Sequence, residues 1–157
     1  MAVWQFTVVL IPKSWAVENE YNSLSLYGED GYATDLTWKF IQPSMNLEGI
    51  LSEILPPGKS WHDDMKHWGK SAENDIKVWY DEKRISEISI RLDLRQSPNP
   101  VVQKVIFAAQ QLGCSLFLPE HRDIIDPELD NFKLSIEKSR AWRCLNDPER
   151  FFDEINK

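Results

Sequence analysis

The fold is decided by two neighbouring runs of sequence, Asp75-Ile-Lys-Val-Trp-Tyr80 and Ile85-Ser-Glu-Ile-Ser-Ile-Arg-Leu-Asp-Leu-Arg95. In both runs apolar residues alternate with polar ones, which is typical of a β-strand that buries one face. Four charged residues at positions 81–84 separate the runs and suit an exposed turn. The pattern therefore predicts a hairpin. Its second strand is expected to bury Ile88, Ile90, Leu92 and Leu94 and to present Glu87, Ser89, Arg91, Asp93 and Arg95 on the other face.

An apolar helix and a further strand are expected after this hairpin. Pro100 suits a first helical position, and Asn99 suits the capping position before it. Apolar residues then recur every three or four positions as far as Leu112, which predicts a helix with one buried face. Gly113 stands where a left-handed residue commonly ends a helix. The nearly all-apolar run at 114–118 predicts a short strand.

Upstream of the hairpin, local patterns predict a strand and a helix. Residues 3–12 are rich in β-branched and aromatic side chains and favour a central strand that is covered on both faces. Turn residues at 27–32 favour a second hairpin within residues 13–42. A helix is expected to begin at Pro43 and to end before the Pro-Pro-Gly run at 56–58, because its apolar residues share one face.

The other segments are expected to be loops and C-terminal helices. Residues 59–74 show no clear periodicity and predict a loop that includes a helical turn. A polar connection is expected at 121–130, a helix from there to Cys144, and a last short helix after Asp147-Pro148. The complete order predicts a single α+β domain over residues 1–157. Its sheet is expected to follow the βαββαβ, ferredoxin-like order, with additional helices at the C-terminus.

Composition places the chain among globular proteins of the cytoplasm. It has 157 residues, of which 42% are hydrophobic and 27% are charged. No apolar run approaches the roughly 20 residues that cross a bilayer, and no secretory signal is visible, so no membrane association is expected. Cys114 and Cys144 stand in apolar contexts, which predicts free thiols in a reducing compartment.

The net charge of −7 is concentrated in one early segment. Between Lys13 and Lys39 the chain has no basic residue but has five acidic ones: Glu18, Glu20, Glu29, Asp30 and Asp35. A direct nucleic-acid ligand is not expected, because phosphate binding needs a clustered basic face. Such a segment instead favours a protein partner of opposite charge.

Seven tryptophans are many for this length. Trp15 and Trp38 flank the run that contains the five acidic residues, and aromatic residues beside charge are common anchors of protein interfaces. Trp38 is therefore a candidate partner-binding residue together with the five carboxylates. Tryptophans that close a core over long loops would give the same pattern, and both interpretations stay open.

No motif in the chain indicates catalysis, a cofactor or a metal. His62 and His67 are five residues apart, which does not match the spacing of a zinc-protease helix. Cys114 follows the expected end of a helix, where the helix dipole raises the pKa of a thiol, so a nucleophilic pair with His121 is not expected. Phosphate loops, dinucleotide glycine patterns and nucleophile elbows are absent from the sequence. The row of Arg91, Asp93 and Arg95 favours ion pairs over a ligand site.

An alternative function is a small-molecule or enzymatic site between the predicted loop at 59–74 and the sheet. That hypothesis combines the aromatic and histidine residues of the loop with the polar face of the sheet. Its residues are Trp61, His62, His67, Trp68, Arg91 and Arg95.

Several short motifs resemble a family of small uncharacterised bacterial proteins. They are Leu55-Pro-Pro-Gly-Lys-Ser-Trp61, Trp68-Gly69, Asn74-Asp75-Ile76-x-Val78, Arg91-x-Asp93-Leu-Arg95 and the Asp147-Pro148 helix start. Some members of that family belong with polymorphic toxin and immunity gene clusters. The resemblance covers most of residues 55–155 and implies a cytoplasmic binding protein of the immunity or antitoxin type, with no catalytic residue. The leading hypothesis is thus a non-enzymatic protein-binding domain that neutralises a basic toxin.

Overall fold

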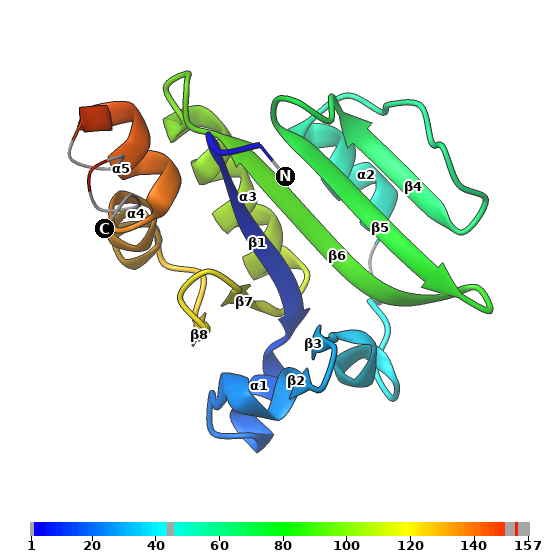
Figure 1. Cartoon of the computed structure of the whole chain (residues 1–157). Coiled ribbons are helices and arrows are strands. Elements are labelled where there is room, and N and C mark those ends of the chain that lie inside the picture. Colours follow the sequence, from blue (N-terminus) through cyan, green and yellow to red (C-terminus); the bar gives the residue numbers. More distant parts are fainter. Residues whose placement is uncertain (1, 44–45, 150–152, 154–157) are drawn as a thin grey trace.

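A computed structural model describes residues 2–43, 46–149 and 153 of the chain. Within these residues a six-stranded antiparallel sheet runs through the molecule (Figure 1). Its strands, in spatial order, are β4 (Met65–Gly69), β5 (Asp75–Asp81), β6 (Arg84–Asp93), β1 (Gln5–Pro12), β7 (Cys114–Leu118) and β8 (Asp123–Ile125). The expected α+β class is confirmed.

The predicted central hairpin forms between β5 and β6. Ile76 faces Ile90 and Val78 faces Ile88 across the pair, so the apolar residues of both strands share one buried face. Glu82 and Lys83 both have positive φ, at 50° and 68°, and form the tight turn between the strands. This is the backbone geometry that two-residue hairpins favour, even though the turn has no glycine or asparagine.

Strand β1 lies at the centre of the sheet and is largely covered on both faces, as predicted. It pairs with β6 on one side and with β7 on the other. Phe6, Val8 and Leu10 point into the main core, while Val9 and Ile11 point into a second, smaller core. The two parities of β1 are therefore both apolar because each one faces its own cluster.

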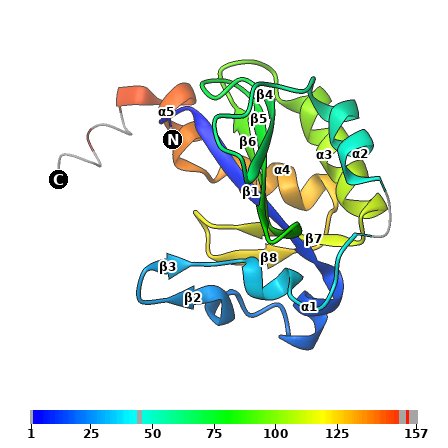
Figure 2. The ribbon, with the colours of Figure 1, turned by 90° about the vertical axis from the view of Figure 1, so that its right-hand side faces the viewer.

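Two helices cover the face that carries the main core. They are α2 (Leu47–Ile54) and α3 (Asn99–Gln111), which lie side by side on the same side of the sheet (Figure 2). Asn99 is the first helical residue and Pro98 is at the capping position, so this helix begins one residue earlier than expected. Gly113 has a φ of +66°, the left-handed conformation predicted at the end of α3.

Residues 13–42 form α1 (Lys13–Glu18), the 3-10 helix η1 (Ser23–Leu26), the short strands β2 (Tyr27–Gly28) and β3 (Gly31–Tyr32), and the 3-10 helix η2 (Asp35–Trp38). The part of this segment up to Tyr32 covers part of the opposite face, whereas Trp38 packs in the main core. The hairpin predicted around 27–32 is confirmed, but its strands are short and the 3-10 helices η1 and η2 flank them. Leu26 and Ala16 pack with Phe117 in the smaller core.

Three predictions about the outer elements were wrong. Strand β4 forms where residues 59–74 were expected to be a loop, and β8 forms within the expected polar connection. The predicted C-terminal helix is divided into α4 (Leu129–Glu137) and α5 (Arg140–Asn146). Because β4 and β8 extend the sheet at both edges, its six-stranded order does not by itself show the ferredoxin-like order.

The expected helix start at Pro43 was wrong, because α2 begins at Leu47 and Asn46 caps it by accepting a hydrogen bond from the Gly49 N–H. Most of the last short helix expected after Pro148 lies outside the described residues. Among the helices that the structure describes, none has the length and apolar character that spanning a bilayer requires.

Candidate functional site

The five predicted acidic residues are all exposed. Glu18 lies at the end of α1 and Glu20 follows it, Glu29 and Asp30 form the turn between β2 and β3, and Asp35 begins η2. Figure 1 shows α1, β2 and β3 gathered at one end of the molecule. We call residues 13–42 the acidic segment. One cation from outside it lies against this hairpin, because the Arg122 guanidinium is 4.9 Å from the centre of the Tyr27 ring.

Trp38 does not belong to this surface. Its side chain is 2% exposed and packs in the main core, because η2 turns it inward towards the sheet. The prediction that Trp38 anchors a partner is therefore wrong, and the core interpretation holds. Its indole Nε1 is buried and has no hydrogen-bond partner among the described residues.

The aromatic residue at the surface is Phe40, two positions further on. Its side chain is 86% exposed, and Leu36 and Ile41 beside it are also exposed. The Lys39 ammonium lies 5.4 Å from the centre of the Phe40 ring. We call Leu36, Phe40 and Ile41 the apolar tip of the acidic segment. The sequence pattern missed it, because a hairpin was expected within residues 13–42 and the 3-10 helix η2 was not.

Hydrogen bonds hold the apolar tip against the start of β6. Gln42 accepts a hydrogen bond from the backbone N–H of Ile85 at 2.8 Å and donates one to the carbonyl of Trp38 at 2.9 Å. The Arg84 guanidinium donates to the carbonyl of Lys39 at 2.7 Å. Phe40 is therefore exposed on a segment whose backbone is fixed to the sheet.

The polar face of the sheet carries a buried ionic network. Asp75 accepts a hydrogen bond from Arg91 Nε at 2.7 Å, and its other oxygen lies 3.1 Å from His67 Nε2. Arg91 and Asp75 face each other on β6 and β5, so this contact is the kind of cross-strand ion pair that was predicted. Hydrogen bonding to Asp75 raises the pKa of Arg91, and the pair is fixed on the sheet.

The other residues of the predicted small-molecule site are divided between separate places. Trp68 lies on the helix side of the sheet, where its Nε1 donates to Ser52 at 3.0 Å. Trp61 and His62 are exposed and pack against Trp79, at ring-centre distances of 5.6 Å and 5.3 Å. His67 and Arg91 meet at Asp75, so the structure brings together only part of the predicted set.

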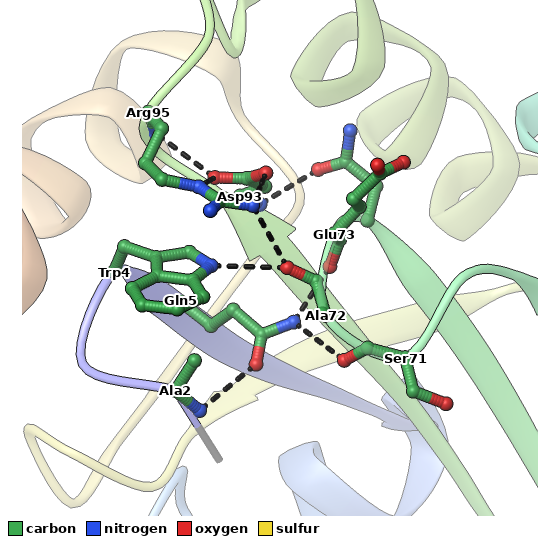
Figure 3. A network of polar contacts seen from close by, with 9 residues as sticks. Ala2, Trp4, Gln5, Ser71, Ala72, Glu73, Asp93 and Arg95 are labelled. Carbon is green, nitrogen blue, oxygen red and sulfur yellow. Dashed lines mark hydrogen bonds and ion pairs between the residues drawn. The ribbon is translucent and has the colours of Figure 1, made fainter.

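Arg95 belongs to a third cluster, which joins the N-terminus to the connection between β4 and β5 (Figure 3). Its guanidinium pairs with Asp93 at 2.9 Å and stacks on the Trp4 ring at 4.1 Å. Hydrogen bonds from Arg95 lower the pKa of the Asp93 carboxyl. Trp4 and Arg95 both donate to the carbonyl of Ala72, so these residues hold two distant segments together.

Metal ligands and an activated thiol are not found in the part of the chain that the structure describes. No group of three His, Cys, Asp or Glu side chains there is arranged to hold a metal ion. His62 accepts a hydrogen bond from the backbone of Asp64 and lies apart from His67. Burial raises the pKa of the Cys114 thiol to about 12, so this thiol is not ionised at neutral pH.

The structure defines an α+β protein with an acidic segment on one face of its sheet. Compared with protein families, curated proteins and solved structures, the chain matches none of them.

Proposed function

We propose that this protein is a non-enzymatic protein-binding domain whose partner is a basic protein. The observation that carries the proposal is the nearly complete exposure of Phe40 at the end of a segment without basic residues between Lys13 and Lys39. An exposed aromatic ring loses contact with water when a partner covers it, and such rings are frequent interface anchors.

Charge complementarity specifies the kind of partner. Five exposed carboxylates precede the apolar tip in the sequence, and the turn residues Glu29 and Asp30 project at the end of a hairpin. A negative surface attracts a positively charged protein before contact, which raises the association rate at low salt. A basic toxin, such as a nuclease, has the required charge.

The apolar tip supports a stable complex as well as a fast encounter. Leu36, Phe40 and Ile41 present three large apolar side chains close together in the sequence. Burying apolar surface contributes about 25 cal/mol per Å², whereas exposed ion pairs contribute little. The carboxylates are therefore assigned to association and the apolar tip to retention of the partner.

The resemblance to proteins of toxin and immunity gene clusters makes this proposal more specific. We infer an immunity-type inhibitor that acts in the cytoplasm and neutralises its partner by covering it. An inhibitor of this kind needs surface complementarity and no catalytic group.

We further propose that the inner part of the fold is a ferredoxin-like unit. The adjacency of β5, β6, β1 and β7 supports this assignment, as does the placement of α2 and α3 on one face. In this interpretation β4 and β8 are additions at the two edges of the sheet.

Co-expression with the product of the adjacent gene tests the proposed function. The tagged wild-type protein should retain that product on a column, and the Phe40→Ser variant should retain much less of it. Phe107→Ser is the matched control, because Phe107 is another exposed phenylalanine, at 56%, but lies on α3. Equal retention by all three proteins, or no retention by the wild type, would contradict the proposal.

A further inference from the structure

The polar face of the sheet contains a hollow that the proposed function does not use. It has a volume of about 710 Å³, within the range of small-molecule sites. Its floor is formed by β5, β6 and β1, and Tyr32 of β3 and Glu120 after β7 contribute to its walls. The polar residues on its floor include Lys77, Glu87, Ser89 and Arg91.

Three of these floor residues, Lys77, Glu87 and Ser89, make no side-chain hydrogen bond within the part of the chain that the structure describes. Lys77 faces Ser89 across the β5–β6 pair, and Glu87 is two residues before Ser89. Among the described residues, none of the three side chains forms an ion pair with another side chain. These three neighbouring groups therefore remain available to a ligand that enters the hollow.

Lys77 and Glu87 have opposite charges and are diagonal neighbours on the sheet. Diagonal side chains of this length are within reach of each other. The Lys77 ammonium instead lies 5.6 Å from the centre of the Trp61 ring. Burial raises the pKa of Glu87 despite the opposing effect of Lys77, as expected of a carboxylate that has lost water without gaining a close partner.

Arg91 adds a fixed donor at the other end of the hollow. Two nitrogens of its guanidinium are held by Asp75, which orients the group on the sheet. A guanidinium has five N–H donors, and the bonds to Asp75 leave others available. The Arg91 side chain is 17% exposed and lines the hollow.

We propose that the hollow binds a small carboxylate that also carries an amino or hydroxyl group. Lys77, Ser89 and Arg91 hold the carboxylate, and Glu87 accepts a hydrogen bond from the amino or hydroxyl group. A ligand with both functions satisfies the donors and the acceptor together, whereas a simple anion leaves Glu87 without a partner and near a second negative charge. A simple cation likewise leaves Lys77 and Arg91 unsatisfied.

Titration of the ¹⁵N-labelled protein with glycine, L-serine and L-lactate, followed by NMR, tests this proposal. At least one of these probes should shift the amide signals of residues 77, 87 and 89 in a saturable way. Acetate and methylamine, which each carry one of the two functions, should bind at least about tenfold more weakly, a difference of about 1.4 kcal/mol.

Matched variants assign the binding to the hollow. Lys77→Met and Glu87→Gln should each weaken binding of the best probe at least about tenfold. Lys83→Met and Glu82→Gln change the same charges on the exposed β5–β6 turn and should bind like wild type. Dispersed spectra show that each variant is folded.

Several results would overturn the proposal. They are the absence of saturable shifts with all three carboxylate probes at tens of millimolar, equal binding of acetate, and unchanged binding by Lys77→Met and Glu87→Gln. The hollow variants should still retain the protein partner, so failure of this site and failure of the proposed function are distinguishable.

Discussion

Trp38 and Phe40 provide a direct test of which aromatic residue supports the fold and which is available to a partner. The two side chains are two positions apart, but Trp38 is 2% exposed and Phe40 is 86% exposed. Replacing each one by alanine in turn removes an aromatic ring from nearly adjacent positions. The two variants should have very different free energies of unfolding.

The expected cost at Trp38 follows from two opposing effects. Removing a buried tryptophan side chain usually destabilises a protein by about 3–5 kcal/mol. The Trp38 Nε1 group has no partner among the described residues, and a buried unpaired donor costs about 1–3 kcal/mol in the folded state. Trp38→Ala removes that penalty together with the ring, so the net loss should be about 2 kcal/mol, the difference between the midpoints of the two ranges.

Phe40→Ala should change the free energy of unfolding by less than about 0.5 kcal/mol, because it removes a ring that is mostly in water. Trp38→Phe is an informative third variant, since it keeps an aromatic ring in the core and removes the unpaired donor. It should lose less than Trp38→Ala.

Urea unfolding at neutral pH measures all three differences from the midpoint and the slope of the transition. A loss at Phe40→Ala that equals the loss at Trp38→Ala would refute the assignment of Phe40 to a free surface. A negligible loss at Trp38→Ala would refute the assignment of Trp38 to the core.

Three further predictions concern the sheet. Ile90→Ala should lower the free energy of unfolding by about 2–5 kcal/mol in the same assay, and Ser89→Ala by less than about 0.5 kcal/mol, because only Ile90 is fully buried. Equal effects of the two substitutions would contradict the assignment of Ile90 to the buried face of β6. Asp75→Asn should cost about 2–4 kcal/mol, since it breaks a buried pair whose Arg91 side chain keeps some contact with water, and a neutral result would contradict the network. Glu87→Gln should gain stability relative to wild type as the pH rises above about 4.5, because the raised pKa of Glu87 means that ionisation costs the folded state more than the unfolded state. Thermal melting from pH 4 to 7 should show the difference in melting temperature between the two proteins increasing. A difference that does not change with pH would contradict this prediction.

The centre of the fold could be predicted from sequence because its patterns are local. Alternation in residues 85–95 and helical spacing in 100–112 each report which residues face a core, and β5, β6, α3 and β7 form where these patterns place them. Strand β4 was missed because His67 and Trp68 are both buried, one on each face, so no alternation marks it. The burial of His67 depends on Asp75, a contact across two strands that sequence spacing does not reveal.

The candidate surfaces were predicted less completely than the core. Exposure of the five carboxylates followed from their charge. The burial of Trp38 and the exposure of Phe40 depend on the 3-10 helix at 35–38, which the sequence pattern did not indicate. The hollow depends on cross-strand register, since Lys77 and Glu87 become diagonal neighbours only when β5 and β6 pair at Lys77–Ser89. Arg91 was recognised as a candidate because its strand face was already predicted.

The most direct test of the proposed function is the association rate constant with the basic partner, measured as a function of ionic strength. Neutralising Glu29 and Asp30 together should slow association at low salt by about two- to tenfold, with a weaker dependence on salt and an unchanged dissociation rate. Glu53→Gln with Glu137→Gln is the matched control, because both residues are exposed and lie on α2 and α4. If the control pair slows association as much as the Glu29 and Asp30 pair, or if neither pair slows it at low salt, the acidic segment does not guide the partner and the proposed function is contradicted.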